Sequence, residues 1–275
     1  MPEAAAGHRL AVGGPPRRAA SRAPHPVASV AAGTMARVDE ETEDPTAAPQ
    51  RRAAPTAHPD DARLPRRPVG LLPLPRIARP DLASPHLTLV TLQSRDAYRT
   101  LLHDGVLRAR PEHGEPGFRE AYTWMGARMR DRLPTDGDGM LWAWARATRR
   151  ALLQHARQAR GEVLVVARVA RERVLLSDYL DWHQVLNRSL NVVPLPGERD
   201  DAWERRFETV YEAWASEADA YRDVAWDAWP RELRATTETS WDAIFDLDAV
   251  PTTRPLQATV HELAVTDVVR AVQVS

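Results

Sequence analysis

The chain contains no cysteine, which excludes disulfide bonds, cysteine nucleophiles and thiolate metal sites. It also contains no lysine, so all 37 basic residues are arginine. A composition that uses only arginine and is rich in alanine and proline is typical of a bacterium with a high-GC genome. Any site in this chain therefore has to be built without thiol or lysine side chains.

A strong net charge and long apolar runs are also missing. With 37 basic and 38 acidic residues, the formal net charge is −1, which gives no general electrostatic case for binding nucleic acid or an anionic membrane. No apolar run approaches the ~20 residues that a membrane-spanning helix needs. The sequence also lacks the apolar core of a secretory signal, so we expect a cytoplasmic protein without a membrane partner.

Residues 1–85 form one compositional unit. They hold 15 of the 23 prolines and none of the nine tryptophans. Their apolar residues are mostly alanine, so little apolar area is present to offset the entropy of ordering the chain. We therefore predict a disordered Pro/Ala/Arg-rich tail, with Met1 or Met35 as the true start. An alternative role for this tail is to bind nucleic acid through its arginines.

Residues 86–275 contain the patterns of regular structure. Alternating, β-branched segments predict strands at 86–92, 140–146, 161–169, 256–263 and 268–274. Apolar residues at helical spacing predict helices at 94–104, 118–133, 148–160, 177–187, 200–228 and 240–248. Because no regular strand–helix–strand rhythm appears, we predict a single compact α+β domain with a small mixed or antiparallel sheet flanked by helices.

The most distinctive stretch is residues 174–187, VLLSDYLDWHQVLN. Ser177 is predicted to cap a helix, and Asp178 follows in the first turn, where the helix dipole favours negative charge. His183 lies one turn further along the same helix. These polar side chains are suited to lining a small-molecule pocket, and the alternative is that they satisfy buried backbone groups.

Familiar catalytic motifs are absent. There is no GxGxxG after a strand, no P-loop, no HExxH and no GxSxG. His, Asp and Glu residues do not cluster at metal-ligand spacing, so no metal is expected. Trp142 and Trp144 alternate in LWAW and share a strand face, where they form either core or an aromatic wall for a ring-containing ligand.

Four segments together resemble one family. They are TLQSRDAYRTLLHDGVL, LWAW, VLLSDYLDWHQVLN, and SWDAIFDLD followed by LQATVHEL. In order and spacing they resemble the bacterial family known as domain of unknown function 3841, over about residues 88–274. The family implies no established activity, so the resemblance leaves the function open.

A second resemblance covers the start of the domain. The sequence from Gln93 to Leu107 leads from a first strand into a capped helix and then Gly-Val-Leu, and this is similar to the opening of compact ADP-ribosyltransferase-like domains. Such domains bind NAD with a polar residue at the end of the first strand. The resemblance therefore implies NAD as the cofactor, with Gln93 and Ser94 among the residues that contact it.

The same resemblance implies a catalytic Glu on a late strand, two residues after a Gln or Glu. Gln257 holds the first of these positions, but position 259 is Thr. Glu262 faces away from Gln257 by the two-residue period of a strand. Because an oxocarbenium-like transition state needs a nearby carboxylate, another acid such as Asp178 has to substitute if the domain is catalytic.

Three functions follow as hypotheses. The first is an NAD-using transferase-like enzyme, such as a toxin or a modifier of a macromolecule, with Asp178 or His183 as the acid or base. The second is a non-catalytic module that binds a nucleotide or a partner through the same cleft. The third is a purely structural domain. In the first two, the cleft is lined by Gln93, Ser94, Trp144, Ser177, Gln257 and His261.

Overall fold

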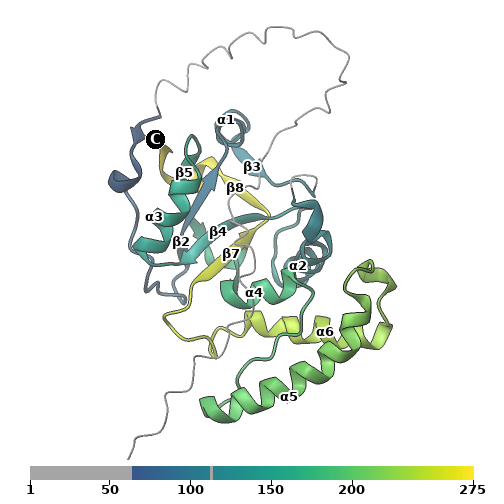
Figure 1. Cartoon of the computed structure of the whole chain (residues 1–275). Helices are drawn as coiled ribbons and strands as arrows, with labels where there is room; N and C mark the ends of the chain where they lie inside the picture. The colour runs from purple at the N-terminus through teal and green to yellow at the C-terminus, as the bar shows by residue number, and fades with distance from the viewer. Residues whose placement is uncertain (1–63, 112–113) are drawn as a thin grey trace, which may run out of the picture. The chain divides into compact units, whose positions relative to one another are not determined.

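A computed structural model describes residues 64–111 and 114–275 (Figure 1). They fold as an α+β domain, which confirms the predicted class. The strands are β1 (Arg66–Arg67), β2 (His86–Gln93), β3 (Val106–Arg108), β4 (Leu141–Arg146), β5 (Val163–Ala170), β6 (Leu175–Asp178), β7 (Leu256–Val260), β8 (Glu262–Ala264) and β9 (Val268–Val274). The helices are α1 (Arg95–Asp104), α2 (Arg119–Arg132), α3 (Arg149–Gln158), α4 (Tyr179–Leu186), α5 (Asp200–Ala218) and α6 (Arg231–Trp241). Short 3₁₀ helices are η2 (Val69–Leu71), η4 (Pro116–Phe118), η5 (Arg171–Arg173), η6 (Asp219–Tyr221), η7 (Trp226–Ala228), η8 (Asp242–Phe245) and η9 (Val265–Asp267).

Two sheets organise these elements. The larger sheet has the strand order β1-β9-β5-β2-β4-β7-β6, and β3 pairs with β8 in a smaller one. In the described part of the chain, β1 and β9 run parallel and the other pairs are antiparallel, so the large sheet is mixed. All eight residues of β2 pair with β5. The chain passes from the large sheet to the small one between β7 and β8, and His261 lies at this joint.

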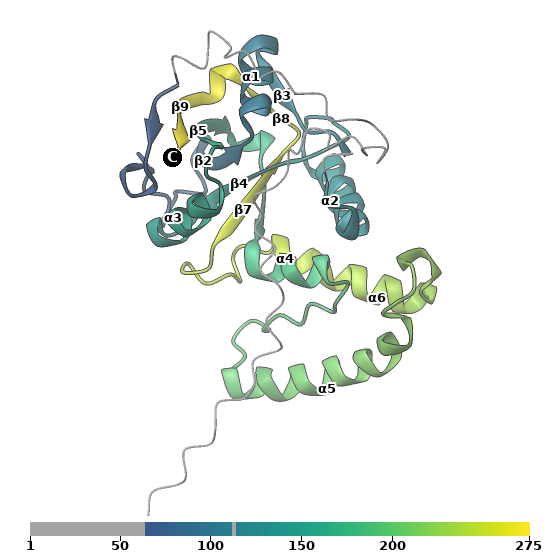
Figure 2. The same cartoon turned by 45° about the horizontal axis from the view of Figure 1, so that its top comes forward.

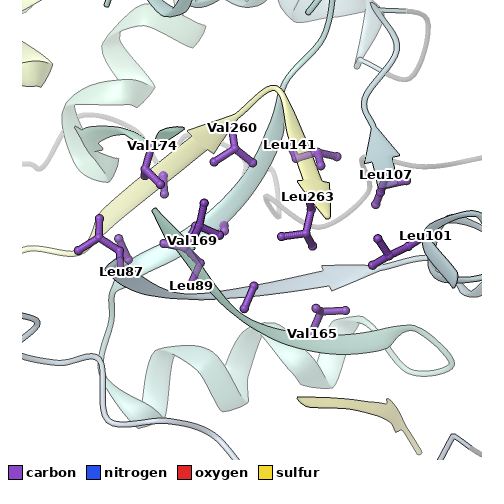
Figure 3. Close-up of a cluster of buried hydrophobic side chains, with 14 of the residues drawn as sticks. Leu87, Leu89, Leu101, Leu107, Leu141, Val165, Val169, Val174, Val260 and Leu263 are labelled. Atoms are coloured by element: carbon purple, nitrogen blue, oxygen red, sulfur yellow. The ribbon is translucent and has the colours of Figure 1, made fainter. Parts of the chain in front are cut away.

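One face of the large sheet carries the main apolar core (Figure 3). Leu87 and Leu89 of β2 lie there because alternate residues of a strand point to the same face. The small sheet and α1 cover this face with Leu101, Leu107 and Leu263. The two-residue period of β2 and β5 thus selects which side chains form the core.

The opposite face is covered in two parts. Over β9, β5 and β2, the helix α3 packs with Leu152 against Leu164 and Val272. Over β6, the helices α4 and α6 pack with Trp182 and Trp241 in the same cluster as Leu175. In Figure 2, α3 lies to the left of β4 and β7, and α4, α6 and α5 lie below them. The helices α4, α5 and α6 with the segments that join them, called here the helical half, therefore supply most of the aromatic core.

The ordered part begins earlier than composition predicts. Residues 64–85 belong to the predicted tail, but β1 pairs with β9, and Val69, Leu72 and Ile77 are buried in the cluster that contains α3. Composition does not predict this order because these few side chains are buried against apolar residues of the sheet and of α3. The prolines of this segment also reduce the entropy lost on ordering it. The rest of the predicted tail, residues 1–63 with both candidate start residues, lies outside the described residues.

The helix ends test the predicted caps. At α1, the Ser94 Oγ accepts a hydrogen bond from the Ala97 N–H at 3.0 Å, and Gly105 ends the helix with φ 74°, both as predicted. At α4, the predicted cap Ser177 is wrong. The capping residue is Asp178, whose Oδ1 accepts from the Asp181 N–H at 2.8 Å. Pairing of β6 with β7 holds Ser177 within the strand and moves the cap one residue along.

Two predicted elements near the C-terminus also change. The predicted strand 256–263 is two strands, β7 and β8, separated by His261. The predicted helix start at Ser240 is instead the last turn of α6, which begins after Pro230. The sequence did not predict α6 because its threonines have low helix propensity, and burial of Leu233 and Trp241 overrides that preference. Only the first of these changes affects the candidate site.

Candidate functional site

Three of the predicted site residues come together on the large sheet. Trp144 pairs with Gln257, and Gln257 pairs with Ser177, so their side chains form one row on one face, called here the β4–β6 row. The row is covered. Ser177 is 0% exposed and Gln257 is 3% exposed, and the Trp144 ring lies 4.7 Å from the ring of Tyr179 in α4. The space left beside Gln257 is about 20 Å³, which holds roughly one water molecule.

The β4–β6 row has unsatisfied polar atoms. Ser177 Oγ and Gln257 Nε2 have no hydrogen-bond partner among residues 64–111 and 114–275. Leaving such atoms unpaired costs free energy, and a water in the small space beside Gln257 would satisfy its amide. The row therefore has the polarity of a site but lacks room for a cofactor.

Asp178 is enclosed in an ionic network. Its carboxylate is 0% exposed, caps α4 and accepts from Arg254 Nη2 at 2.6 Å, and the same Nη2 donates to Asp181 Oδ1 at 2.6 Å. Burial is the largest effect and raises the pKa of Asp178, while the nearby Arg254 lowers it. A carboxylate held in this way stabilises the helix start and does not touch a ligand without local opening.

His183 contacts a residue of its own helix. Its Nδ1 lies 2.9 Å from the backbone oxygen of Tyr179, one turn earlier, and its ring meets the Tyr179 ring edge to face at 4.8 Å. The Tyr179 ring in turn contacts Trp144. The two predicted catalytic residues, Asp178 and His183, thus lie near the β4–β6 row in positions that suit structural roles.

The remaining predicted residues lie elsewhere. Gln93 is three residues beyond Val90, which pairs with Trp144, so alternation puts Gln93 on the face opposite the β4–β6 row. Its Nε2 donates to Thr91 Oγ1 at 2.8 Å, and Ser94 caps α1. His261 lies at the joint between β7 and β8. The structure therefore divides the predicted cleft among three places.

A larger cavity lies at the start of α2. Its volume is about 370 Å³, within the range of small-molecule sites. Its lining residues are Ala109, Arg110, Pro111, Gly114, Glu115, Pro116, Arg119, Tyr122, Thr123, Asp138, Gly139 and Met140. It is called the α2 cavity below. No residue predicted for the cleft lines it, because its walls come from three separate segments that share no contiguous motif.

Tyr122 fills the inner wall of the α2 cavity. A Cβ built on Gly114 would lie 2.8 Å from Tyr122 Cδ2, so a residue without a side chain lets the backbone approach the ring. Behind it, the Tyr122 ring stacks on Trp182 at 6.5 Å and contacts Trp142 at 6.5 Å. Contacts with Trp142 and Trp182 thus hold the Tyr122 ring in position at the cavity wall.

Charged groups of both signs line the α2 cavity. Arg110 and Arg119 provide cations, and Glu115 and Asp138 provide carboxylates. Burial, followed by the charge of Glu115, raises the pKa of Tyr122 to about 12. Its phenol therefore stays protonated at neutral pH and is able to donate a hydrogen bond.

The loop that carries Gly139 makes a close backbone contact at the cavity wall. A Cβ on Gly139 would lie 2.6 Å from the oxygen and 2.7 Å from the carbonyl carbon of Ala109. We therefore expect Gly139→Ala to lower the free energy of unfolding by about 1–3 kcal/mol, because backbone has to move. Gly126→Ala is the control, since its Cβ meets nothing closer than 3.8 Å and alanine favours the middle of α2. Urea denaturation should show opposite signs, and equal effects would contradict this contact.

The described residues show neither a membrane helix nor a metal cluster. No helix among residues 64–111 and 114–275 is both long and apolar enough to cross a bilayer. In the same part of the chain, no group of three or more His, Asp or Glu side chains is placed to hold a metal ion.

Fold and site together define an α+β domain with a ligand-sized cavity at the start of α2. The chain belongs to the family described as Domain of unknown function (DUF3841), whose model matches residues 88–269. This match confirms the first resemblance, and it spans the α2 cavity and all the site residues predicted from the sequence. No curated protein and no solved structure matches the chain.

Proposed function

We propose that this domain binds a nucleotide in the α2 cavity. The observation that carries the proposal is the combination, in one cavity of about 370 Å³, of two arginines with a supported aromatic wall. Small-molecule sites are typically concave spaces of this size with a few convergent polar groups. The β4–β6 row offers no comparable space.

The arginines that line the cavity suit phosphate. Arg119 is the first residue of α2, and the capping residue Phe118 gives no side-chain hydrogen bond to the helix start. A helix N-terminus carries unpaired backbone N–H groups and a positive dipole end, which together favour anions. Arginine adds charge-assisted, bidentate hydrogen bonds to phosphate oxygens.

Other residues that line the cavity suit a nucleoside. The Tyr122 ring gives apolar surface, and its hydroxyl is a neutral hydrogen-bond donor at pH 7. Glu115 and Asp138 are acceptors for ribose hydroxyls or an exocyclic amine. Cations and carboxylates within one cavity therefore match a ligand that combines phosphate with hydrogen-bond donors.

A second candidate is an NAD-using transferase, as the ADP-ribosyltransferase resemblance implies. The observation that favours it is the pair of carboxylates on the cavity wall, because cleavage of the nicotinamide–ribose bond develops positive charge that a carboxylate stabilises. In this mechanism Glu115 or Asp138 takes the role first assigned to Asp178. An acceptor nucleophile bonds to the ribose carbon, loses its proton to a base, and nicotinamide leaves.

Calorimetry on the full chain tests the proposal. We expect NAD and ADP-ribose to bind, and we expect Arg119→Ala to weaken both by roughly ten- to a hundredfold, the value of a charge-assisted hydrogen bond. Arg157→Ala on α3 is the matched control, because this exposed arginine lies away from the cavity. Absence of binding at millimolar nucleotide, or equal affinity in both variants, would contradict the proposal. Release of nicotinamide in the same sample would favour the transferase.

A further inference from the structure

His261 lies where the chain leaves β7 of the large sheet and enters β8 of the small one. The side chain is 3% exposed. Its Nδ1 lies 2.9 Å from Oγ1 of Thr135, in the loop 133–140 that joins α2 to β4. Its Nε2 has no hydrogen-bond partner in the part of the chain that the structure describes. Since an unpaired buried nitrogen costs free energy, packing alone does not account for a histidine here.

The imidazole also packs against the backbone of loop 133–140. A Cβ on Gly137 would lie 3.0 Å from the His261 Cβ and 3.2 Å from its Cδ2, so glycine allows the close approach. The next residues, 138–140, line the α2 cavity, and Gly139 contacts the backbone of Ala109 on the facing segment. The ring therefore braces the stretch of chain that continues directly into the cavity wall.

We propose that His261 is a positioning residue for the α2 cavity. Its neutral imidazole holds loop 133–140 against the joint between the two sheets, and protonation of the ring releases the loop and weakens nucleotide binding. This inference rests on the proposed function, because it assigns a role in ligand binding to the position of the loop.

Three charged groups act on His261: Asp136 from the loop, Arg130 from α2 and Glu262 from β8. Burial has the largest effect and lowers the pKa of His261. Asp136 and Glu262 act to raise it, and Arg130 acts to lower it. Because the folded pKa lies below the ordinary value of 6.5, the stability that neutral His261 contributes is present above pH 6.5 and is lost as pH falls through the folded pKa.

Protonation gives the ring a second N–H donor. Among the described residues, Thr135 is the hydrogen-bond partner of His261, so the Nε2–H and the positive charge would be buried without an acceptor for that N–H. Moving loop 133–140 outward exposes the ring to water and relieves this cost. The geometry thus links protonation of His261 to the position of the loop that forms part of the cavity wall.

Hydrogen exchange on the full chain tests the loop without any ligand. We expect amides 135–140 to lose about tenfold protection between about pH 7.5 and about pH 5, after correction for intrinsic exchange rates. His261→Gln keeps a hydrogen-bonding amide but does not titrate, so its loop should be equally protected at both values. His103→Gln, which removes an exposed histidine, should retain the wild-type response. If His261→Gln does not fold, Thr135→Val should reduce loop protection already at the higher pH.

NAD affinity at the same two pH values separates the inference from the proposed function. We expect about tenfold weaker binding at the lower pH in the wild type and no change in His261→Gln. If the loop responds to pH but NAD does not bind, the loop contact of His261 stands and the proposed function fails. If NAD binds while loop protection is independent of pH, or if His261→Gln keeps the pH response, the positioning role is overturned.

Discussion

Arg254→Ala is expected to lower the free energy of unfolding by about 3 kcal/mol at pH 7. The arginine donates to both Asp178 and Asp181, and Asp178 is fully buried. Removing the cation leaves an uncompensated buried carboxylate, and breaking a buried ion pair from one side costs about 3–5 kcal/mol. The lower end applies because the Asp181 N–H still bonds to Asp178. Urea denaturation at equilibrium measures the difference.

The pH dependence of the stability lost in Arg254→Ala tests the same ion pair. Burial already raises the pKa of Asp178, and loss of Arg254 removes an influence that lowers it. An acid whose folded pKa lies above its unfolded value weakens the fold above that pKa. The deficit should therefore shrink as pH falls and Asp178 takes up a proton. Adding Asp178→Asn, which keeps an oxygen for the cap, should recover stability at pH 7, and a double variant as unstable as Arg254→Ala alone would contradict the assignment.

Trp241→Ala should cost about 3–5 kcal/mol, the range for deleting a buried aromatic side chain. The ring is 0% exposed, meets Trp124 edge to face at 5.5 Å and stacks on Trp226 at 5.2 Å. Its Nε1 donates to the Ser189 backbone oxygen at 2.7 Å, so the change also leaves a carbonyl unpaired. The helical half should therefore depend on this one side chain more than on any exposed aromatic residue.

Trp203→Ala on α5 is the matched control for Trp241→Ala. Trp203 is half-buried, and its Nε1 donates to the Val192 oxygen at 3.2 Å, so a smaller loss is expected. Trp241→Phe should recover part of the stability, because it restores most of the buried area without the hydrogen bond. Denaturation midpoints that rank Trp203→Ala below Trp241→Ala would contradict the central packing role of Trp241.

Local patterns predicted the elements whose signals lie within a few residues. The cap of α1 at Ser94 and its end at Gly105 depend only on neighbouring backbone, and both are confirmed. The cap of α4 depends on a distant strand, because pairing with β7 decides that Ser177 stays in β6. The sequence likewise does not predict the break between β7 and β8 at His261, because alternation continues across it.

Local sequence patterns likewise predict only part of the candidate site. Pairing of β4, β7 and β6 brings Trp144, Ser177 and Gln257 into one row, and no local sequence pattern shows this pairing or the cover that α4 provides. The α2 cavity joins residues 109–111, 114–116, 119, 122–123 and 138–140, and its existence depends on how α2 and loop 133–140 meet. Neither arrangement has a local sequence pattern, because each depends on packing between segments that are distant in the sequence.

The proposed function uses different acids from those that the sequence predicts. From the sequence, Asp178 was the carboxylate for transfer chemistry, and in the structure it is a buried cap held by Arg254. Glu115 and Asp138 instead line open space. The two proposed functions, nucleotide binding without catalysis and NAD-dependent transfer, both use this cavity, and they differ in whether one of these two acids acts on the bound ligand.

The most direct test of nucleotide binding in the α2 cavity is to map amide chemical shifts of the full chain with and without ADP-ribose. The account predicts that the largest changes fall on Gly114, Glu115, Arg119 and Gly139, with Ser177 and Gln257 unaffected. Arg119→Ala should reduce these changes at the same ligand concentration. Changes centred on Ser177 and Gln257, or no changes at millimolar ADP-ribose, would contradict the account.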